Sequence, residues 1–327
     1  MKIGIVGAGN WGLNLIRNFC KILGIENVVV CDTNRDRLLG LKSEYPGIEN
    51  TENFQDILSS DEIEAVVIAT PAETHYELSK KALLSGKHVF VEKPITLDVD
   101  EAEELIKIAE KNHLTLMVDH ILEYHPVICE MKKLIETKAL GEIYYIYSQR
   151  LNLGIIRSHE NALWSLGPHD ISVYLYLLNE EPDAITATGG VYIQNKKNIE
   201  DTVFLHLHFL SGVDAHAHLS WLDPHKIRRL TVVGSEKMAV FDDMEPRNKL
   251  IIFDKGAEWT EKGGVGVRYG DIRIPNIPMK EPLMLACKHF LECIEKGKIP
   301  RSDGNDGLKV LKILKKAQKS LEERKVI

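Results

Sequence analysis

Short apolar runs alternate with longer amphipathic segments over the first 120 residues of the chain. The apolar runs predict buried strands, and the segments with helical spacing predict helices. We expect strands at residues 3–6, 28–31, 65–69, 88–91 and 115–118, and the clearest helices at 73–85 and 99–112. Apolar strands interleaved with amphipathic helices are typical of a parallel sheet that is covered on both faces.

Beyond about residue 122 the pattern changes to strands of alternating polarity that follow one another with few helices between them. The predicted strands are 143–151, 184–193, 203–210, 213–221 and 228–233, and the predicted helices are 167–178, 282–296 and 304–323. This pattern predicts an α+β domain with a large, mostly antiparallel sheet. We therefore expect an α/β protein with a Rossmann domain at 1–121 and a second domain at 122–327. The final helix, 304–323, is expected to pack back towards the first domain.

The first predicted strand runs directly into the motif Gly7-x-Gly9-x-x-Gly12, after which a helical pattern begins. In a dinucleotide-binding fold, Gly7 allows a tight turn, Gly9 lets the backbone approach a pyrophosphate, and Gly12 lets the helix pack on the strand. The phosphate charge then lies at the helix N-terminus, where free N–H groups favour an anion. A glycine turn in another kind of βαβ unit is the alternative.

The second predicted strand ends at Asp32, 20 residues beyond Gly12. A carboxylate at this position accepts hydrogen bonds from the adenosine ribose and repels a 2′-phosphate, so the sequence favours NAD over NADP. Arg35 and Arg37 follow closely and leave NADP as the alternative cofactor.

Polar residues also follow the later predicted strands. Thr70 comes after the third strand, Lys93 after the fourth and His120 after the fifth. Because ligands of parallel sheets bind beyond the carboxyl ends of the strands, we expect these residues and Asp32 to share one crevice.

Composition narrows the class of protein further. The 327 residues carry a net charge of −7, and no stretch concentrates lysine and arginine, which argues against a nucleic-acid partner. No apolar segment approaches the roughly 18 residues that a transmembrane helix needs. The five cysteines are scattered without metal-ligand spacing, which predicts thiols in a reducing compartment, with the cytoplasm as the default, and no metal site.

Two residues suit the oxidation of an alcohol. A lysine at a strand end, Lys93, is positioned to stabilise the alkoxide that develops as hydride leaves. His169 follows Gly167 and Pro168, which we expect to open a helix, and an imidazole suits the role of general base at neutral pH. The alternatives are a surface lysine in a turn and a histidine that is bonded to Asp170 or to the backbone.

Four histidines, His206, His208, His216 and His218, lie on two successive predicted strands. A two-residue loop at Ser211-Gly212 would place the two pairs on opposite sides of the sheet. That register predicts packing or an interface rather than a shared metal, and a slip of one residue would reverse it.

The motifs together resemble the glucose–fructose oxidoreductase/inositol dehydrogenase/MocA (Gfo/Idh/MocA) family. The resemblance rests on the glycine motif, Asp32, Thr70-Pro71 with His75, Glu92-Lys93-Pro94 and Gly167-x-His169-Asp170. It implies a Rossmann domain, a second domain with an open-faced sheet, and homodimers or homotetramers built on that sheet. It also implies hydride transfer between a nicotinamide and a secondary alcohol, with Lys93 and His169 as catalytic residues and Glu92 and Thr70 near the nicotinamide ribose.

One position departs from the family pattern. Many members place an aspartate four residues before the histidine, where this chain has Ser165. A serine hydroxyl can hydrogen-bond but cannot carry the charge, so Lys93 or Asp170 is expected to take a larger part in proton transfer. The segments around Arg157 and Trp164 look most like members that oxidise UDP-N-acetylglucosamine or its uronate at carbon 3. Arg157 and His120 could meet a diphosphate or carboxylate, or pair internally.

The sequence therefore predicts an NAD-dependent dehydrogenase for a sugar, with a UDP-linked N-acetyl amino sugar favoured. A free sugar or inositol dehydrogenase and an idle NAD-binding sensor are the alternatives. The residues expected to touch the cofactor are Gly7, Ala8, Gly9, Asn10, Trp11, Gly12, Asp32, Thr33, Arg37, Ala69, Thr70, His75, Glu92 and Lys93. Those expected to touch the substrate are His120, Arg157, Trp164, Ser165 and Asp170.

Overall fold

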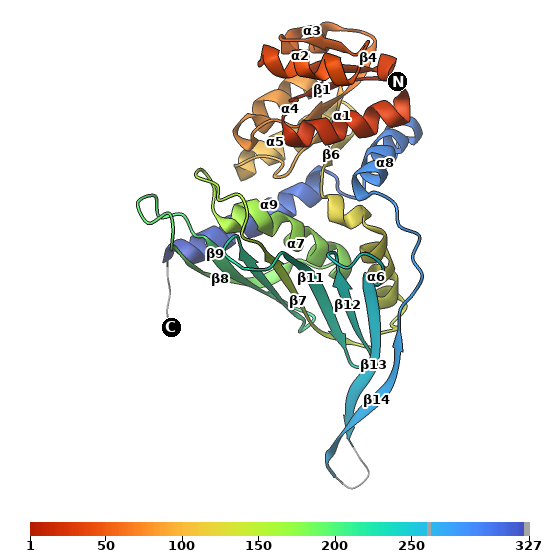
Figure 1. Ribbon diagram of the computed structural model, residues 1–327, viewed down its shortest axis with the longest axis vertical. Coiled ribbons are helices and arrows are strands. Elements are labelled where there is room, and N and C mark those ends of the chain that lie inside the picture. The colour runs from red at the N-terminus through yellow and green to blue at the C-terminus, as the bar shows by residue number, and fades with distance from the viewer. Residues whose placement is uncertain (260–262, 324–327) are drawn as a thin grey trace. The chain divides into compact units, whose positions relative to one another are not determined.

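The computed structural model describes residues 1–259 and 263–323, which form two compact units (Figure 1). The first unit joins Met1–Tyr124 to Lys280–Leu311, and the second joins His125–Met279 to the chain from Lys312 onward. The expected boundary at residue 121 had left 280–311 with the second domain, whereas the structure groups this segment with the first unit. None of the helices in the described residues has the length and apolar character needed to cross a membrane.

The first unit contains a six-stranded sheet in the order β3-β2-β1-β4-β5-β6. All neighbouring strands pair in parallel, as predicted. The strands are β1 (Lys2–Val6), β2 (Val28–Cys31), β3 (Glu49–Thr51), β4 (Ile63–Ile68), β5 (His88–Val91) and β6 (Leu116–Val118). Strand β3 was not predicted, because its three residues, Glu49, Asn50 and Thr51, are polar and give no apolar run.

The helices of the first unit pack around an apolar core in which Phe90 of β5 is central. Its ring lies edge-on to Phe19 and to Phe290, with ring centroids 6.2 and 5.4 Å apart. Phe290 comes from the segment Lys280–Leu311, so this segment completes the core of the first unit. The helices are α1 (Asn10–Leu23), α2 (Arg35–Glu44), α3 (Phe54–Ser59), α4 (His75–Leu84), α5 (Val99–Lys111) and α8 (Pro282–Lys296), with short 3₁₀ turns η1 (Ile25–Asn27), η2 (Ala72–Thr74) and η3 (Ile121–Tyr124).

The second unit contains an eight-stranded sheet in the order β14-β13-β12-β11-β7-β10-β9-β8. Strands β7 and β10 pair in parallel and the other neighbours are antiparallel, which confirms a mostly antiparallel sheet. Helices α6 (Pro126–Glu136) and α7 (Ala162–Leu178) pack on one face of it (Figure 1). The strands are β7 (Ile143–Leu151), β8 (Pro182–Gly190), β9 (Thr202–Phe209), β10 (Asp214–Ser220), β11 (Ile227–Gly234), β12 (Met238–Asp242), β13 (Leu250–Trp259) and β14 (Val265–Arg273). The division between the units falls within α9 (Gly304–Glu323).

Helix α7 begins earlier than the sequence predicted. The expectation that Gly167 and Pro168 open the helix is wrong, because the helix starts at Ala162 and Pro168 lies inside it. The side chain of Asn161 caps the N-terminus by accepting a hydrogen bond from Trp164 N at 3.1 Å. His169 therefore lies in the second turn of a long helix and not at its N-terminal end.

The predicted register of β9 and β10 is also wrong by one residue. The hairpin closes at Phe209 and Val213, so the loop has three residues, and Gly212 adopts a positive φ of 84°. Three-residue hairpin loops commonly end on a glycine in this conformation. His206 consequently faces His216 directly, and all four histidines lie on the side of the sheet opposite the buried Leu205, Leu207 and Ala217.

Candidate active site

The glycine motif connects β1 to α1 and leaves an open space above the backbone. Gly7 has a φ of 102°, and a Cβ there would lie 2.6 Å from the carbonyl oxygen of Ala69. A Cβ on Gly12 would lie 2.0 Å from Gly7 O, so the helix and the loop touch without room for a side chain. At Gly9 a Cβ would meet no atom within 4 Å. Because α1 begins directly afterwards, its unpaired N–H groups face this space, which fits a dinucleotide pyrophosphate.

Asp32 lies at the end of β2 and holds the glycine motif against the second strand. Its Oδ2 accepts a hydrogen bond from Ala8 N at 2.7 Å, and its Oδ1 accepts one from Asn34 N at 2.8 Å. Arg37 Nη1 lies 3.3 Å from Oδ2. The carboxylate is thus fixed at the strand end where a ribose would bind, with Thr33 exposed beside it.

His75 joins the loops that follow β4 and β5. Its Nδ1 lies 2.7 Å from Pro94 O, and its Nε2 lies 2.9 Å from Thr70 O. Burial lowers the pKa of His75 despite these two contacts, and a neutral ring can donate to only one of them. The ring is 1% exposed, so it supports the two loops, and any effect on a bound cofactor would pass through them. The Thr70 and Thr74 hydroxyls lie 2.6 Å apart in the first of these loops.

Glu92 and Lys93 are the first two residues beyond β5, and the Lys93–Pro94 peptide bond is cis. Glu92 N donates to Ile68 O at 2.9 Å, which holds the strand end against β4. Asp119 occupies the matching place beyond β6, where its N donates to Val91 O at 2.9 Å. Sequence reasoning did not select Asp119, although its position after a buried strand matches that of Glu92.

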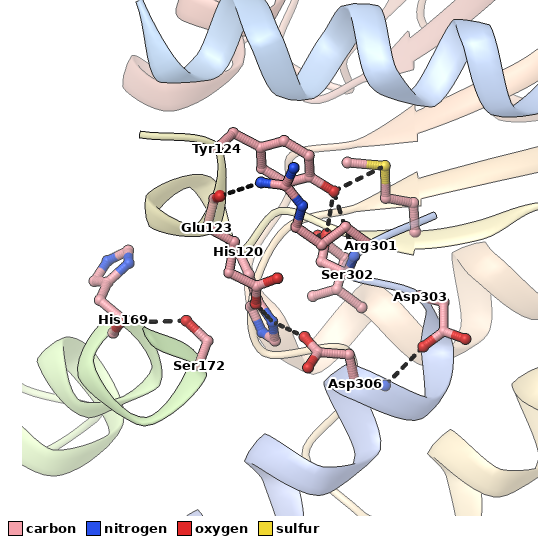
Figure 2. Close-up of polar contacts among 11 residues, drawn as sticks. His120, Glu123, Tyr124, His169, Ser172, Arg301, Ser302, Asp303 and Asp306 are labelled. Carbon is pink, nitrogen blue, oxygen red and sulfur yellow. Dashed lines mark hydrogen bonds and ion pairs between the residues drawn. The ribbon is translucent and has the colours of Figure 1, made fainter. Parts of the chain in front are cut away.

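His120 is buried among carboxyl groups of the first unit (Figure 2). Its Nδ1 lies 2.6 Å from Asp306 Oδ2 and 3.4 Å from Glu123 Oε1. Burial alone would lower the pKa of His120, but the hydrogen bonds to Asp306 and Glu123 outweigh it and raise the pKa to about 10. Burial, together with the nearby Asp306, raises the pKa of Glu123 to about 8. His120, which was expected to meet substrate, therefore has the internal partners of a buried ion pair.

The same three side chains, His120, Glu123 and Asp306, offer ligand atoms within 4.8 Å of one another. Among the described residues they form the one group close enough to hold a metal ion, so the histidines of β9 and β10 do not form one. The contact of 2.6 Å between His120 and Asp306 is that of a charge-assisted hydrogen bond. A protonated imidazole between two carboxyl groups accounts for the cluster without a metal.

The predicted residues of the second unit lie on α7. Ser165 and His169 are four residues apart on this helix, so they lie on the same side of it. Ser165 is buried, and His169 O accepts a hydrogen bond from Ser172 Oγ at 3.2 Å (Figure 2). Trp164 is half-buried and its Nε1 donates to Gln318 Oε1 at 3.1 Å.

Two further predicted substrate residues have ionic partners within the second unit. Asp170 binds Arg150 through two hydrogen bonds, from Nε at 2.6 Å and from Nη2 at 3.3 Å. Arg157 lies in the segment before α7, and its Nε is 3.1 Å from Glu160 Oε1. Asp170 therefore links α7 to β7 through Arg150, and its part in proton transfer stays a prediction.

Two family models match the chain. Residues 1–120 match the oxidoreductase family with an NAD-binding Rossmann fold, and residues 128–240 match the GFO/IDH/MocA C-terminal domain. The chain belongs to the GFO/IDH/MocA oxidoreductase family. It is therefore an NAD-binding oxidoreductase, and the fold predicted from the sequence is confirmed.

Individual relatives cover nearly the whole chain. A UDP-N-acetylglucosamine 3-dehydrogenase of Acidithiobacillus ferrooxidans is 28% identical over 95% of this chain and 94% of its own. A myo-inositol 2-dehydrogenase of Thermotoga maritima is 24% identical over 100% of this chain and 98% of its own. The crystal structure of a putative oxidoreductase from Magnetospirillum magnetotacticum is 30% identical, covers 97% of this chain and 99% of its own, and superposes with a TM-score of 0.83.

The first unit of this family member has the features that a nicotinamide dinucleotide requires. The space above Gly9 would be narrowed by any side chain, and Asp32 stands at the end of β2. Glu92 Oε1 and both oxygens of Asp119 are buried without a hydrogen-bond partner in the described structure. These residues therefore fit the cofactor that the family model describes.

Proposed function

We propose that this protein is an NAD-dependent dehydrogenase that oxidises carbon 3 of a UDP-linked N-acetyl amino sugar. The observation that carries the proposal is the relationship to the UDP-N-acetylglucosamine 3-dehydrogenase of Acidithiobacillus ferrooxidans, which extends over 95% of this chain. The segments around Arg157 and Trp164 support the same substrate class, because an exposed arginine suits a diphosphate.

In this proposal the first unit binds the cofactor and the second unit supplies the substrate site. Asp32 supports NAD over NADP, since its buried carboxylate would repel a 2′-phosphate. Arg37, which contacts Asp32, remains the residue that would have to move to bind such a phosphate.

The proposed chemistry divides the work between two side chains. A nicotinamide bound to the first unit would supply the acceptor for the hydride of the alcohol carbon. His169 takes the hydroxyl proton as the general base, and the Lys93 ammonium stabilises the negative charge that develops on the alcohol oxygen. Ser165, one helical turn before His169, offers a hydroxyl in place of a carboxylate, so it can orient the imidazole but cannot hold a compensating charge.

We also propose that the protein forms a homodimer or homotetramer through the uncovered face of the large sheet. Tyr145, Tyr147 and Phe204 are 40%, 37% and 53% exposed on this face. Tyr147 and Phe204 line a groove of about 310 Å³ together with His206 and His216. Apolar rings gathered on an open sheet are typical of an association surface.

The test is the reduction of NAD in the presence of a panel of substrates. We expect reduction with UDP-N-acetylglucosamine or its uronate, and little with the corresponding free sugars. The relationship to a myo-inositol dehydrogenase makes inositols the second candidate, and turnover with these alone would replace the nucleotide sugar. Tight NAD binding without turnover on any substrate would favour a redox sensor.

A further inference from the structure

Glu92 and Asp119 lie side by side at the carboxyl edge of the parallel sheet. Strands β5 and β6 pair with Val91 opposite Val118, so the next residue of each strand is also a neighbour. The backbone hydrogen bond from Asp119 N to Val91 O, 2.9 Å long, holds the two strand ends together. Two acidic side chains are thereby fixed next to each other by the sheet itself.

Three of the four oxygens of this pair lack the partners that a buried charge needs. Asp119 is 1% exposed, and neither of its oxygens has a hydrogen-bond partner in the described structure. Glu92 Oε1 is likewise buried without a hydrogen-bond partner in the described structure. Trp11, from the glycine motif, lies near both groups. Two adjacent, desolvated carboxylates cannot both be ionised at low cost, so they share one proton.

The charged surroundings favour a single negative charge on the pair. Burial raises the pKa of Glu92 well above its ordinary range, and the neighbouring Asp119 raises it further. Burial also raises the pKa of Asp119, while its contacts with Glu92 and Trp11 and the positive charges of His120 and Lys93 act in the opposite direction. Cys287 of α8 is also buried, and burial together with the charges of Asp119, Glu281 and Glu92 raises the pKa of its thiol. The two cations therefore favour one negative charge on the pair, and burial opposes a second.

The sheet order places this pair on the nicotinamide side of the cofactor site. Asp32, which marks the adenosine half, follows β2 on one side of the glycine motif. Strands β4, β5 and β6 lie on the other side of β1, where the remaining half of a dinucleotide must extend. Oxidised nicotinamide carries a positive ring charge that the reduced form lacks. A nearby acid with a variable charge therefore interacts differently with the two forms.

We propose that Glu92 and Asp119 act as one acid that distinguishes oxidised from reduced cofactor. Binding of NAD⁺ expels the shared proton to solvent and leaves both carboxylates charged beside the positive ring, whereas binding of NADH leaves the proton in place. Asp119 thereby becomes a determinant of the preference between the two redox forms. The inference rests on the cofactor site of the proposed function and is independent of the sugar.

The expected pH dependence follows from the sign of this linkage. Because the free protein holds one proton more than its NAD⁺ complex, the affinity for NAD⁺ rises with pH until the pair ionises in the free protein. The steepest slope is about tenfold in Kd for each pH unit. The affinity for NADH has no such slope, since both states hold the same proton.

The experiment counts protons on cofactor binding by calorimetry in buffers of different ionisation enthalpy, for NAD⁺ and NADH separately. The wild-type protein is expected to release up to about one proton per NAD⁺ and close to none per NADH. The Asp119→Asn variant is expected to lose this difference, because a single carboxyl next to Lys93 has no like charge to share a proton with. Asp56→Asn, which removes an exposed carboxylate of the same unit, is the matched control and should retain it.

Equal proton release with both cofactor forms, or an unchanged difference in Asp119→Asn, would overturn the inference. Should Asp119→Asn fail to fold, Glu92→Gln gives the same comparison, because it removes the other member of the pair. Failure of the proposed function would give another result. The protein would then oxidise no nucleotide sugar but would still release more protons on binding NAD⁺ than on binding NADH.

Discussion

The carboxyl edge of the parallel sheet and the open face of the large sheet both carry polar side chains, but they hold them in opposite ways. At the edge, Asp32, Asp119 and His120 are buried, and Asp32 and His120 have protein partners at hydrogen-bonding distance. On the open face, His206 and His208 are solvated and share the exposed carboxylate of Asp214, at 2.9 and 2.8 Å. Buried polar groups that strand ends bring together favour chemistry, whereas exposed alternating ones favour association.

The largest expected effect tests whether chemistry belongs to the carboxyl edge and to α7, and not to the open face of the large sheet. Lys93→Met and His169→Ala are each expected to lower kcat by about 10²–10⁴-fold, because in the proposed mechanism each removes a group that acts on the transferred proton or its charge. Steady-state kinetics with UDP-N-acetylglucosamine measure this. His216→Asn, on the open face, is the control and should keep kcat near the wild-type value. A comparable loss in His216→Asn would erase the distinction between the two regions.

The buried cluster at the edge predicts a pH-dependent contribution to stability. The folded-state pKa of His120 is raised from 6.5 to about 10, so its contribution is complete below about pH 6.5 and is lost as the pH rises through 10. The folded-state pKa of Glu123 is also raised, from 4.5 to about 8, and this too makes stability fall with rising pH.

Asp306→Asn removes the carboxylate closest to His120 and tests this cluster. The loss in the free energy of unfolding is expected to be about 3 kcal/mol near pH 6 and to shrink towards pH 10, as urea unfolding would measure. Glu104→Gln, which breaks an exposed contact with Lys80, should leave the pH profile unchanged. A loss that stays constant with pH would mean that His120 is neutral in the folded protein.

The glycine motif provides another test of the difference between the two regions, because its backbone limits which ligand the carboxyl edge can bind. Gly9→Ala is expected to weaken NAD binding by about tenfold or more without lowering the melting temperature, since its Cβ meets only the space left for the cofactor. Gly12→Ala should lower both the affinity for NAD and the melting temperature, because its Cβ would clash with Gly7 O. Gly40→Ala, in the open on α2, is the control and should stabilise the protein by up to about 1 kcal/mol. Fluorescence titration and thermal unfolding separate the three.

The smallest expected effect concerns the open face. Phe204→Glu places a charge among the exposed rings of the sheet and is expected to weaken self-association by about tenfold, which sedimentation would detect. Leu39→Glu, an exposed position on α2, should leave association unchanged. An assembly that tolerates Phe204→Glu would exclude this face as the interface.

Much of the edge could be predicted from the sequence, because strand ends are local features. An apolar run followed by Asp32 or Lys93 identifies both the strand and the residue beyond it. The link that His75 makes between two loops could not be predicted, since its partners are backbone carbonyls 5 and 19 residues away. The roles of Lys93 and His169 stay predictions.

The open face was harder to predict because register depends on the geometry of one turn. A loop of three residues instead of two moved every histidine of β10 relative to β9. The start of α7 was also predicted wrongly. Pro168 suggested the beginning of a helix, but it is tolerated inside a helix whose N-terminus Asn161 caps.

In the proposed reaction, hydride passes from carbon 3 of a nucleotide sugar to a cofactor held at the carboxyl edge. The direct test is turnover of UDP-N-acetylglucosamine that carries deuterium at carbon 3, followed by mass analysis of the cofactor. The deuterium is expected to appear in the reduced nicotinamide ring. Reduced cofactor that carries no deuterium would contradict the proposed reaction.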